Sequence, residues 1–158
     1  MILTTQTIVN SLDNIKSDAE IEAPEKDYLY TSISQLPNAG QGLLTAIDIY
    51  KEEVIAVFTG EIISDDEAER RMKKEEDNYF INLLDGRIMD SKHTFCFAKF
   101  ANDATGNGKT PFKNNAKIAL NDNDEVCLIA TRKIKAGEEI FCGYGREYWK
   151  KHSEKGNH

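Results

Sequence analysis

The stretch ATRKIKAGEEIFCGYG, residues 130–145, does most to decide the fold. A run of apolar and β-branched residues ends at Thr131, and Ala136-Gly137 is typical of a turn. Glu139–Phe141 then predicts a second short strand. Tyr144 follows between two glycines, so a polar aromatic side chain comes directly after a strand where the backbone has little steric hindrance. The stretch therefore predicts two strands around a turn, with a tyrosine at the end.

Upstream of this stretch the pattern is mostly β. Runs of strand length recur between turns that contain glycine, proline or asparagine. They cover Tyr28–Ile33, Leu43–Ile47, Val54–Phe58, Glu61–Ile63, Tyr79–Leu84, Arg87–Met89, Lys117–Leu120 and Val126–Thr131. Asp85-Gly86 favours a tight two-residue hairpin turn. One helix is predicted from Ser64 to Asp77, because Ser64 and Glu67 form a capping box before good helix formers. The sequence thus predicts a small, mainly β domain with one helix.

Composition limits the kinds of function that fit. The chain has 158 residues, of which 40% are hydrophobic and 30% charged, as expected for one soluble domain. No apolar run approaches the roughly 18 residues of a membrane span, and the first 18 residues lack the features of a secretory signal. The net charge of −7 argues against direct nucleic-acid binding and favours a basic partner, such as a lysine-rich peptide.

The three cysteines, Cys96, Cys127 and Cys142, are too few and too scattered for a disulfide framework or a cysteine metal site. The histidines also lack ligand spacing, so no metal is expected. An odd cysteine count suits a reducing, intracellular compartment.

Four segments in order resemble the motifs of the SET-domain family of protein lysine methyltransferases. The segments are GQGLL (Gly40–Leu44); EVIAVFTGEII (Glu53–Ile63); Tyr79-Phe80 with Asp90, KFANDA (Lys99–Ala104) and Asn115-Ala116; and Ala130–Gly145. The resemblance covers residues 28–149, which leaves an N-terminal extension at 1–27 and a flexible tail at 150–158. It implies small curved β-sheets, a short inserted helix and a C-terminal segment threaded through a loop as a pseudoknot, which brings KFANDA beside CGYG. The chain looks like a minimal form without the zinc cysteines that precede or follow the domain in many members.

The activity that the resemblance implies is methyl transfer from S-adenosyl-L-methionine to a lysine of a protein. A free lysine has a pKa of about 10.4, so an apolar channel and the neighbouring sulfonium must disfavour the ammonium form. Catalysis is then mainly positioning, with water as the proton acceptor and no general base. Histone tails are the commonest substrate class, which would place the protein in the nucleus or on chromatin. A non-histone substrate and a catalytically silent SET module that binds peptide or scaffolds a complex are the alternatives, and the oligomeric state stays open.

The resemblance also assigns the site. Tyr144 is expected to orient the amine and the sulfonium through its hydroxyl, and Tyr79 is the second catalytic candidate. The expected cofactor contacts are Ala39, Gly40, Gln41, Gly42, Tyr79, Asn102, Asp103, Tyr144 and Trp149. The expected lysine-channel residues are Phe80, Cys142 and Tyr148. Without the resemblance, the glycine segment would read as a hairpin turn, Asn102-Asp103 as a capped turn, and Tyr148 and Trp149 as packing against the edge of the core.

Two positions depart from the family pattern. Asp103 stands where the family has histidine, and Ala-Thr follows it in place of Ser-Cys. Main-chain contacts to a cofactor would survive that change, whereas a histidine side-chain role would not. Cys142 stands where Phe or Tyr is usual, and its smaller volume predicts room for more than one methyl group on the lysine.

Overall fold

The computed structural model describes residues 21–105 and 110–143, which form three small sheets. The first, in the order β1-β2-β9, contains Leu29–Ile33, Gln41–Thr45 and Glu139–Ile140. The second, β10-β7-β8-β3, contains Cys142–Gly143, Ala116–Leu120, Val126–Ala130 and Val54–Val57. The third, β4-β6-β5, contains Glu61–Ile63, Ile88–Asp90 and Phe80–Asn82. The helices are α2 (Glu25–Tyr28), α3 (Asp65–Lys73) and a 3₁₀ turn (Ala98–Phe100). The predicted mainly β fold is confirmed.

The C-terminal end of the described chain passes between two other segments. Phe141 forms a parallel bridge with Asn102 on one side, and β10 pairs in parallel with β7 on the other, with Cys142 opposite Ala116. The two flanking segments are close to each other in the sequence, and the strand between them comes from the C-terminal end of the described residues. This arrangement is the predicted pseudoknot, and it brings the KFANDA segment beside Cys142-Gly143.

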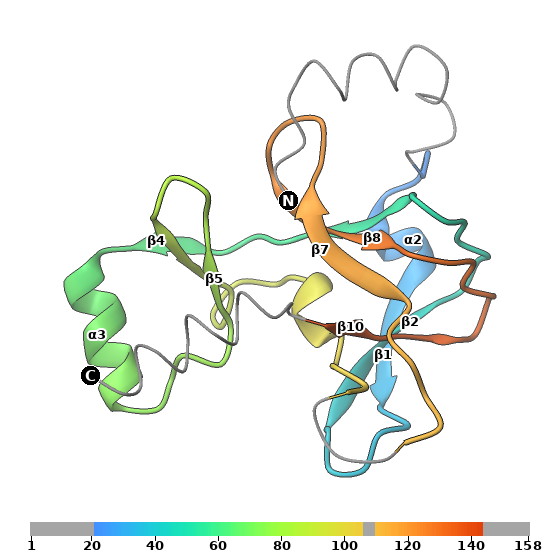
Figure 1. Cartoon of the computed structure of the whole chain (residues 1–158), viewed down its shortest axis with the longest axis horizontal. Coiled ribbons are helices and arrows are strands. Elements are labelled where there is room, and N and C mark those ends of the chain that lie inside the picture. Colours follow the sequence, from blue (N-terminus) through green and yellow to red (C-terminus); the bar gives the residue numbers. More distant parts are fainter. Residues whose placement is uncertain (1–20, 106–109, 144–158) are drawn as a thin grey trace.

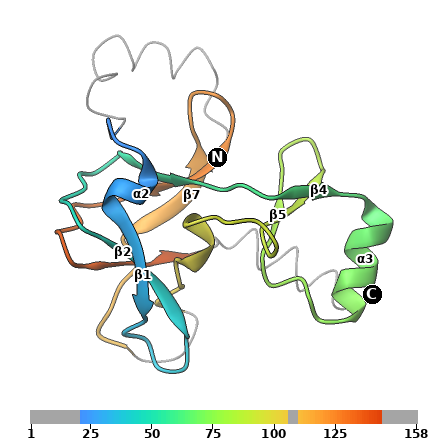
Figure 2. The ribbon, with the colours of Figure 1, turned by 180° about the vertical axis from the view of Figure 1, so that it is seen from behind.

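Strands of the first two sheets supply most of the main core, and the bridged pair Ile49 and Ile134 adds to it. The largest fully buried apolar side chains are Leu43, Ile49, Ile55, Leu128, Ile134 and Ile140. Burying one such side chain stabilises a fold by roughly 1.5–3 kcal/mol. Helix α2 lies at the start of β1, on the far side of the molecule from α3 (Figure 2), and the buried Tyr28 hydroxyl donates to the Ile55 carbonyl at 2.7 Å.

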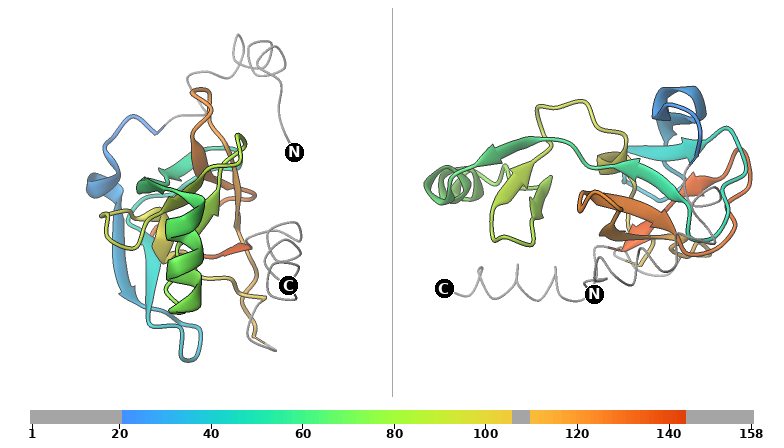
Figure 3. Two further views of the ribbon diagram at one scale, coloured as in Figure 1. Left: turned by 90° about the vertical axis from the view of Figure 1, so that its left-hand side faces the viewer. Right: turned by 90° about the horizontal axis from the view of Figure 1, so that it is seen from above.

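The third sheet and α3 project from the rest of the molecule (Figures 1 and 3). They have a small core of their own, made by Ile63, Ala68, Phe80 and Ile88, with Met72 packed against it. Its residues come from one face of the sheet and the facing side of the helix, so α3 covers that face. No helix in the described ranges is both long and apolar enough to cross a membrane.

Helix α3 begins as predicted and ends earlier. The Ser64 hydroxyl accepts the Glu67 N–H at 3.1 Å, as expected of an N-cap. The predicted end at Asp77 is wrong, because the helix stops at Lys73. Glu75 adopts a left-handed conformation (φ 58°), and the N–H groups of residues 75 and 76 bond back to the carbonyls of residues 72 and 71. That pattern is a Schellman C-cap formed without glycine.

The predicted two-residue turn at Asp85-Gly86 is also wrong. The Leu83 N–H donates to the Arg87 carbonyl at 2.9 Å, which leaves three residues in the loop. The Gly86 N–H donates to the Leu83 carbonyl at 3.0 Å, and Gly86 has φ 87°. A type I turn followed by a left-handed glycine is the usual three-residue hairpin loop.

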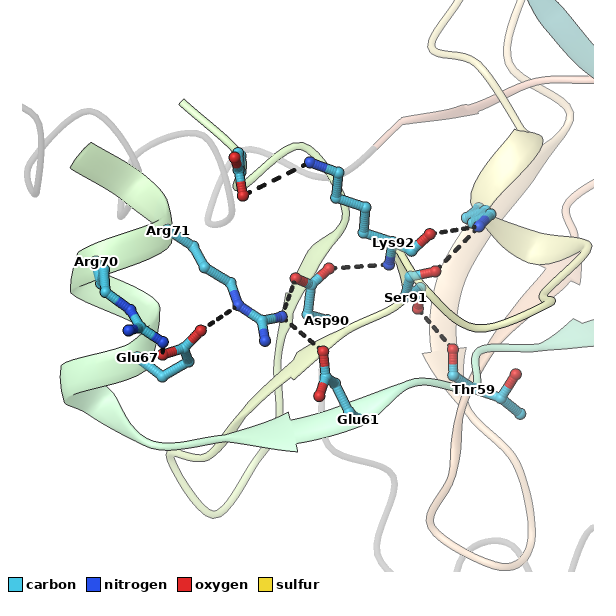
Figure 4. A network of polar contacts seen from close by, with 10 residues as sticks. Thr59, Glu61, Glu67, Arg70, Arg71, Asp90, Ser91 and Lys92 are labelled. Atoms are coloured by element: carbon cyan, nitrogen blue, oxygen red, sulfur yellow. Dashed lines mark hydrogen bonds and ion pairs between the residues drawn. The ribbon is translucent and has the colours of Figure 1, made fainter. Parts of the chain in front are cut away.

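An arginine of α3 ties the helix to the third sheet. The Arg71 guanidinium donates to Asp90 at 2.7 Å, to Glu61 at 2.7 Å and to Glu67 at 2.8 Å (Figure 4). The Asp90 side chain is fully buried, and its second oxygen accepts the Lys92 N–H at 2.9 Å. A buried carboxylate needs such partners, so Arg71 and Asp90 together fix where α3 lies.

Candidate functional site

Three predicted site segments that are far apart in the sequence meet around Asn102. The Asn102 side-chain amide donates to the Gln41 carbonyl at 3.0 Å. Its backbone carbonyl accepts the Cys142 N–H at 2.9 Å, next to its bridge with Phe141. The structure therefore brings together the glycine segment, the Asn-Asp pair and the start of CGYG; of these contacts, the resemblance implied the one between KFANDA and CGYG.

The glycine segment closes the hairpin between β1 and β2. Asn38 and Gly40 have φ of 59° and 69°, in the left-handed region where asparagine and glycine are the most tolerant residues. A Cβ added to Gly40 would meet no atom within 4 Å, so the backbone here faces open space. Ala39 is half-buried and Gln41 is exposed. The segment is a hairpin turn with open space beside Gly40, although the carbonyls of Gly40 and Gln41 already accept hydrogen bonds from Ser34 and Asn102.

At Gly42, the second glycine of this segment, a side chain is excluded by close packing. A Cβ on Gly42 would lie 2.8 Å from the Glu139 carboxyl carbon and 3.3 Å from the Ser34 Cα. Gly42 is buried against that carboxylate. Its expected contact with the cofactor stays a prediction, and its packing against Glu139 is a role that sequence reasoning missed.

Asp103 connects Thr105 to Asn114 beside the C-terminal segment. Its Oδ1 accepts from the Thr105 N–H at 2.8 Å, the Thr105 hydroxyl at 2.6 Å and the Asn114 side-chain amide at 3.0 Å. Asn114 in turn accepts the Ala104 N–H at 2.9 Å. The aspartate that replaces the family histidine is therefore used to shape its own turn, as in the capped-turn interpretation.

Asn115 is a second residue that sequence reasoning missed. It is buried, its side-chain amide donates to the Glu139 carbonyl at 3.0 Å, and its Oδ1 accepts the Phe141 N–H at 2.8 Å. Its backbone N–H donates to the Phe141 carbonyl at 2.9 Å. Asn115 thus binds the threaded segment on both sides of Ile140. The only signal in the sequence was its place in a family motif.

The predicted Tyr79-Phe80 pair divides between two environments. Tyr79 is half-buried, and the Lys99 ammonium lies 5.3 Å from its ring centroid. That ammonium also donates to the carbonyls of residues 91, 92 and 94, so it is held inside a turn. Phe80 packs in the small core under α3 with Ile63. A place for Phe80 in a lysine channel stays a prediction.

Cys142 is buried beside the Asn-Asp pair. Its thiol donates to the Gly143 carbonyl at 3.3 Å. Burial, and secondarily the negative charge of Asp103, raises the pKa of the Cys142 thiol to about 12. The side chain is therefore small and neutral at physiological pH. Tyr144, Tyr148 and Trp149, the remaining predicted site residues, lie outside the described residues.

Across residues 21–105 and 110–143, no three His, Cys, Asp or Glu side chains are grouped so that they could hold a metal ion. The cysteines described there are all buried and free.

Comparison with known proteins places this geometry in a family. The model of the SET domain matches residues 40–145. The chain is 33% identical over 126 residues to "Histone-lysine N-methyltransferase EZH2" of Chaetomium thermophilum, a match that covers 73% of this chain and 8% of that protein. It is 28% identical over 128 residues to the human "Histone-lysine N-methyltransferase, H3 lysine-36 specific", covering 78% of this chain and 5% of that protein.

Two solved structures have a fold similar to that of this chain. One is "ctPRC2 in an autoinhibited conformation bound to S-adenosylmethionine", with TM-score 0.62, 29% identity and coverage of 82% of this chain and 17% of that one. Another is a humanized mutant of the Chaetomium thermophilum Polycomb Repressive Complex 2 bound to the inhibitor GSK126, with TM-score 0.61, 31% identity and coverage of 74% and 15%. The chain spans less than a fifth of the length of these relatives. By the extent of the family match, which runs over most of the described residues, the chain belongs to the SET-domain family.

Proposed function

We propose that the protein transfers methyl groups from S-adenosylmethionine to a lysine side chain of a protein, with a histone as the substrate. The observation that carries the proposal is the meeting of Gln41, Asn102 and Cys142, because these segments match family motifs and come together only in the folded chain. Two further findings support it. The relatives bear the names of histone-lysine methyltransferases, and a solved relative of similar fold is bound to S-adenosylmethionine.

The residues present fit that cofactor. Its methionine end carries a carboxylate and an ammonium, which peptide N–H and carbonyl groups can bind. The backbone at Gly40 faces open space and offers peptide groups between Ala39 and Gln41, and the Asn102 amide lies beside Gln41. Asp103, Tyr79, Tyr144 and Trp149 are the other proposed contacts. When bound, the cofactor supplies a methyl group on a sulfonium, so that a C–N bond to lysine forms as the C–S bond breaks.

The chain's own residues would mainly position the substrate lysine and shield its amine from water. A narrow apolar surrounding favours the neutral, nucleophilic amine of the substrate lysine. The Tyr144 hydroxyl would orient that amine toward the methyl carbon. Because the thiolate is the reactive form of cysteine, the raised pKa of Cys142 keeps this neighbouring thiol from competing for the methyl group.

A histone substrate also fits the charge of the protein. The net charge is −7, and lysine-rich histone tails are strongly basic, so long-range attraction favours their encounter. A histone substrate would place the protein on chromatin through that protein partner, without direct contact to DNA.

Binding of S-adenosylmethionine, measured by calorimetry, tests the cofactor half of the proposal. Wild-type protein and an Asn123→Ala control, changed in the exposed β7-β8 loop, should bind equally. Asn102→Ala should bind at least about tenfold more weakly, because the hydrogen bond that holds Gln41 is lost. A folded wild-type protein that shows no measurable binding would contradict the proposal. The catalytically silent module that binds peptide would then be the remaining interpretation.

Transfer of labelled methyl groups to a panel of histones and to cell lysate tests the substrate half. Tyr144→Phe should abolish most of the transfer while leaving the protein folded. If lysate proteins are labelled and no histone is, the proposed histone substrate is wrong and the substrate is another protein. Transfer that survives Tyr144→Phe undamaged would remove Tyr144 from its proposed role.

A further inference from the structure

A buried carboxylate links the GEE motif to the hairpin turn that carries the proposed cofactor contacts. Glu139 is only 2% exposed. Its Oε2 accepts the Ser34 hydroxyl at 2.6 Å, and its Oε1 accepts the Gln35 N–H at 2.8 Å. The Ser34 hydroxyl oxygen also accepts the Leu36 N–H at 3.1 Å. Burial of a charge is unfavourable without such donors, so the carboxylate and the turn hold each other in place.

The effect of this contact reaches the other end of the turn. The Ser34 N–H donates to the Gly40 carbonyl at 2.8 Å. Fixing Ser34 therefore fixes Gly40, the residue whose backbone faces open space. Leu36 adds an apolar anchor, because it is buried with Phe141 under the same turn. The turn is thus held by a polar and an apolar contact to one strand segment.

Gly42 and Glu139 depend on each other. The carboxylate occupies the space in which a side chain at residue 42 would lie, with the carboxyl carbon 2.8 Å from an added Cβ. The backbone of Glu139 is itself fixed by pairing with Leu44 and by the Asn115 amide. The carboxylate therefore has a defined position rather than a flexible one.

We infer that Glu139 is a positioning residue for the cofactor segment: through Ser34 and Gln35 it sets the backbone of residues 38–41 without touching the cofactor. The inference rests on the proposed function, since it assigns the segment that Glu139 positions to S-adenosylmethionine.

The test compares Glu139→Ala with Glu138→Ala, a matched change at the neighbouring, half-buried glutamate. Affinity for S-adenosylmethionine is measured by calorimetry well below the unfolding temperature of each variant. Glu139→Ala and Ser34→Ala should each raise the Kd by about tenfold, and Glu138→Ala should leave it within about twofold. Glu139→Gln should restore most of the affinity, because its amide can accept from Gln35 and donate to Ser34.

Hydrogen exchange on the protein without cofactor gives an independent readout. The N–H groups of Gln35 and Leu36 should exchange faster in Glu139→Ala than in Glu138→Ala. Normal affinity and unchanged exchange in a folded Glu139→Ala would overturn the inference, as would a lower unfolding temperature with unchanged affinity. If the wild type does not bind the cofactor, the proposed function fails, and unchanged exchange would then separately refute the contact.

Gly42→Ala distinguishes a specific loss of positioning by Glu139 from a general loss of stability. Alone it should weaken cofactor binding, because the new methyl displaces the Glu139 carboxylate. In a Glu139→Ala background the same change should have a much smaller further effect, because the carboxylate is gone and only the Ser34 Cα, at 3.3 Å, remains close to the new methyl. Additive losses from the two substitutions would contradict the coupling.

Discussion

Replacing Arg71 with alanine should destabilise the protein far more than the same change at its neighbour, Arg70. The Arg71 side chain is 16% exposed and pairs with Asp90, which is fully buried. Removing one partner of a buried ion pair leaves an uncompensated charge and costs about 3–5 kcal/mol. The pair with Glu61 adds little, since that glutamate is 46% exposed and exposed pairs contribute about 0–1 kcal/mol. Arg71→Ala should therefore lower the free energy of unfolding by at least about 3 kcal/mol.

Arg70→Ala is the matched control. Arg70 lies on the same helix, pairs with Glu67 and is 67% exposed. Its loss should change the free energy of unfolding by less than about 0.5 kcal/mol. Both variants replace arginine by alanine, the best helix former, so a difference between them reports the buried pair and not the intrinsic stability of the helix.

Urea unfolding at low and high salt is the assay. A loss of about 3 kcal/mol lowers the urea midpoint by about 1–3 M. Because salt screens exposed charges much more than buried ones, 1 M NaCl should leave most of the Arg71→Ala effect intact. A double change, Arg71→Met with Asp90→Asn, should recover part of the lost stability, since no buried charge remains unpaired. Equal stabilities of Arg71→Ala and Arg70→Ala within about 0.5 kcal/mol would refute the reasoning.

Three further predictions concern the threaded segment and the buried cysteines Cys127 and Cys142. Asn115→Ala should lower the free energy of unfolding by about 2–5 kcal/mol, because two buried backbone groups lose their partners; Asn114→Ala, measured in the same urea titration, should cost less. Burial raises the pKa of Cys127 and Cys142 from 9.0 to about 12, so the native state keeps protons that the unfolded state releases. The contribution of these two thiols to stability should therefore be constant up to about pH 9 and be lost as the pH rises toward 12. Replacing both cysteines with alanine should make the alkaline fall in stability smaller, as measured by urea titrations between pH 9 and 12. Wild-type protein should add more than one methyl group and Cys142→Tyr only one; mass spectrometry that finds only monomethyl-lysine from the wild type would contradict the volume argument.

Local features of the fold could be predicted because their signals lie within a few residues. The β7-β8 pair follows from two apolar runs around NDND, and the start of α3 follows from the Ser64 cap. The predicted end of α3 failed because of an unexpected backbone conformation. Glu75 takes the left-handed conformation that usually calls for glycine or asparagine, so α3 stops where no such residue marks its end.

The contacts that assemble the site could not be read from the sequence, because they join distant segments. Glu139 and Ser34 are 105 positions apart, and Asn102 and Gln41 are 61 apart. Family resemblance predicted that the KFANDA segment lies beside CGYG, but it did not predict the contact between Glu139 and Ser34 or what the Asn115 side chain does. A glutamate in a charged GEE triplet reads as solvent-exposed, and only the topology of the pseudoknot shows that one of its two carboxylates is buried.

The side chains that hold the site bond mainly to backbone groups, and this bears on the departure at residue 103. Asn102 holds the carbonyl of residue 41, Asn115 holds the backbone of residues 139 and 141, and Glu139 holds an N–H of the hairpin turn. Peptide groups are the same whatever the side chain, so a cofactor site made largely of them tolerates substitution as long as the backbone path is kept. Asp103 keeps that path by bonding to Thr105 and Asn114. The loss of the family histidine is therefore compatible with the proposed cofactor site. The substitution changes the residue type at position 103, but the backbone that the proposed site depends on is kept.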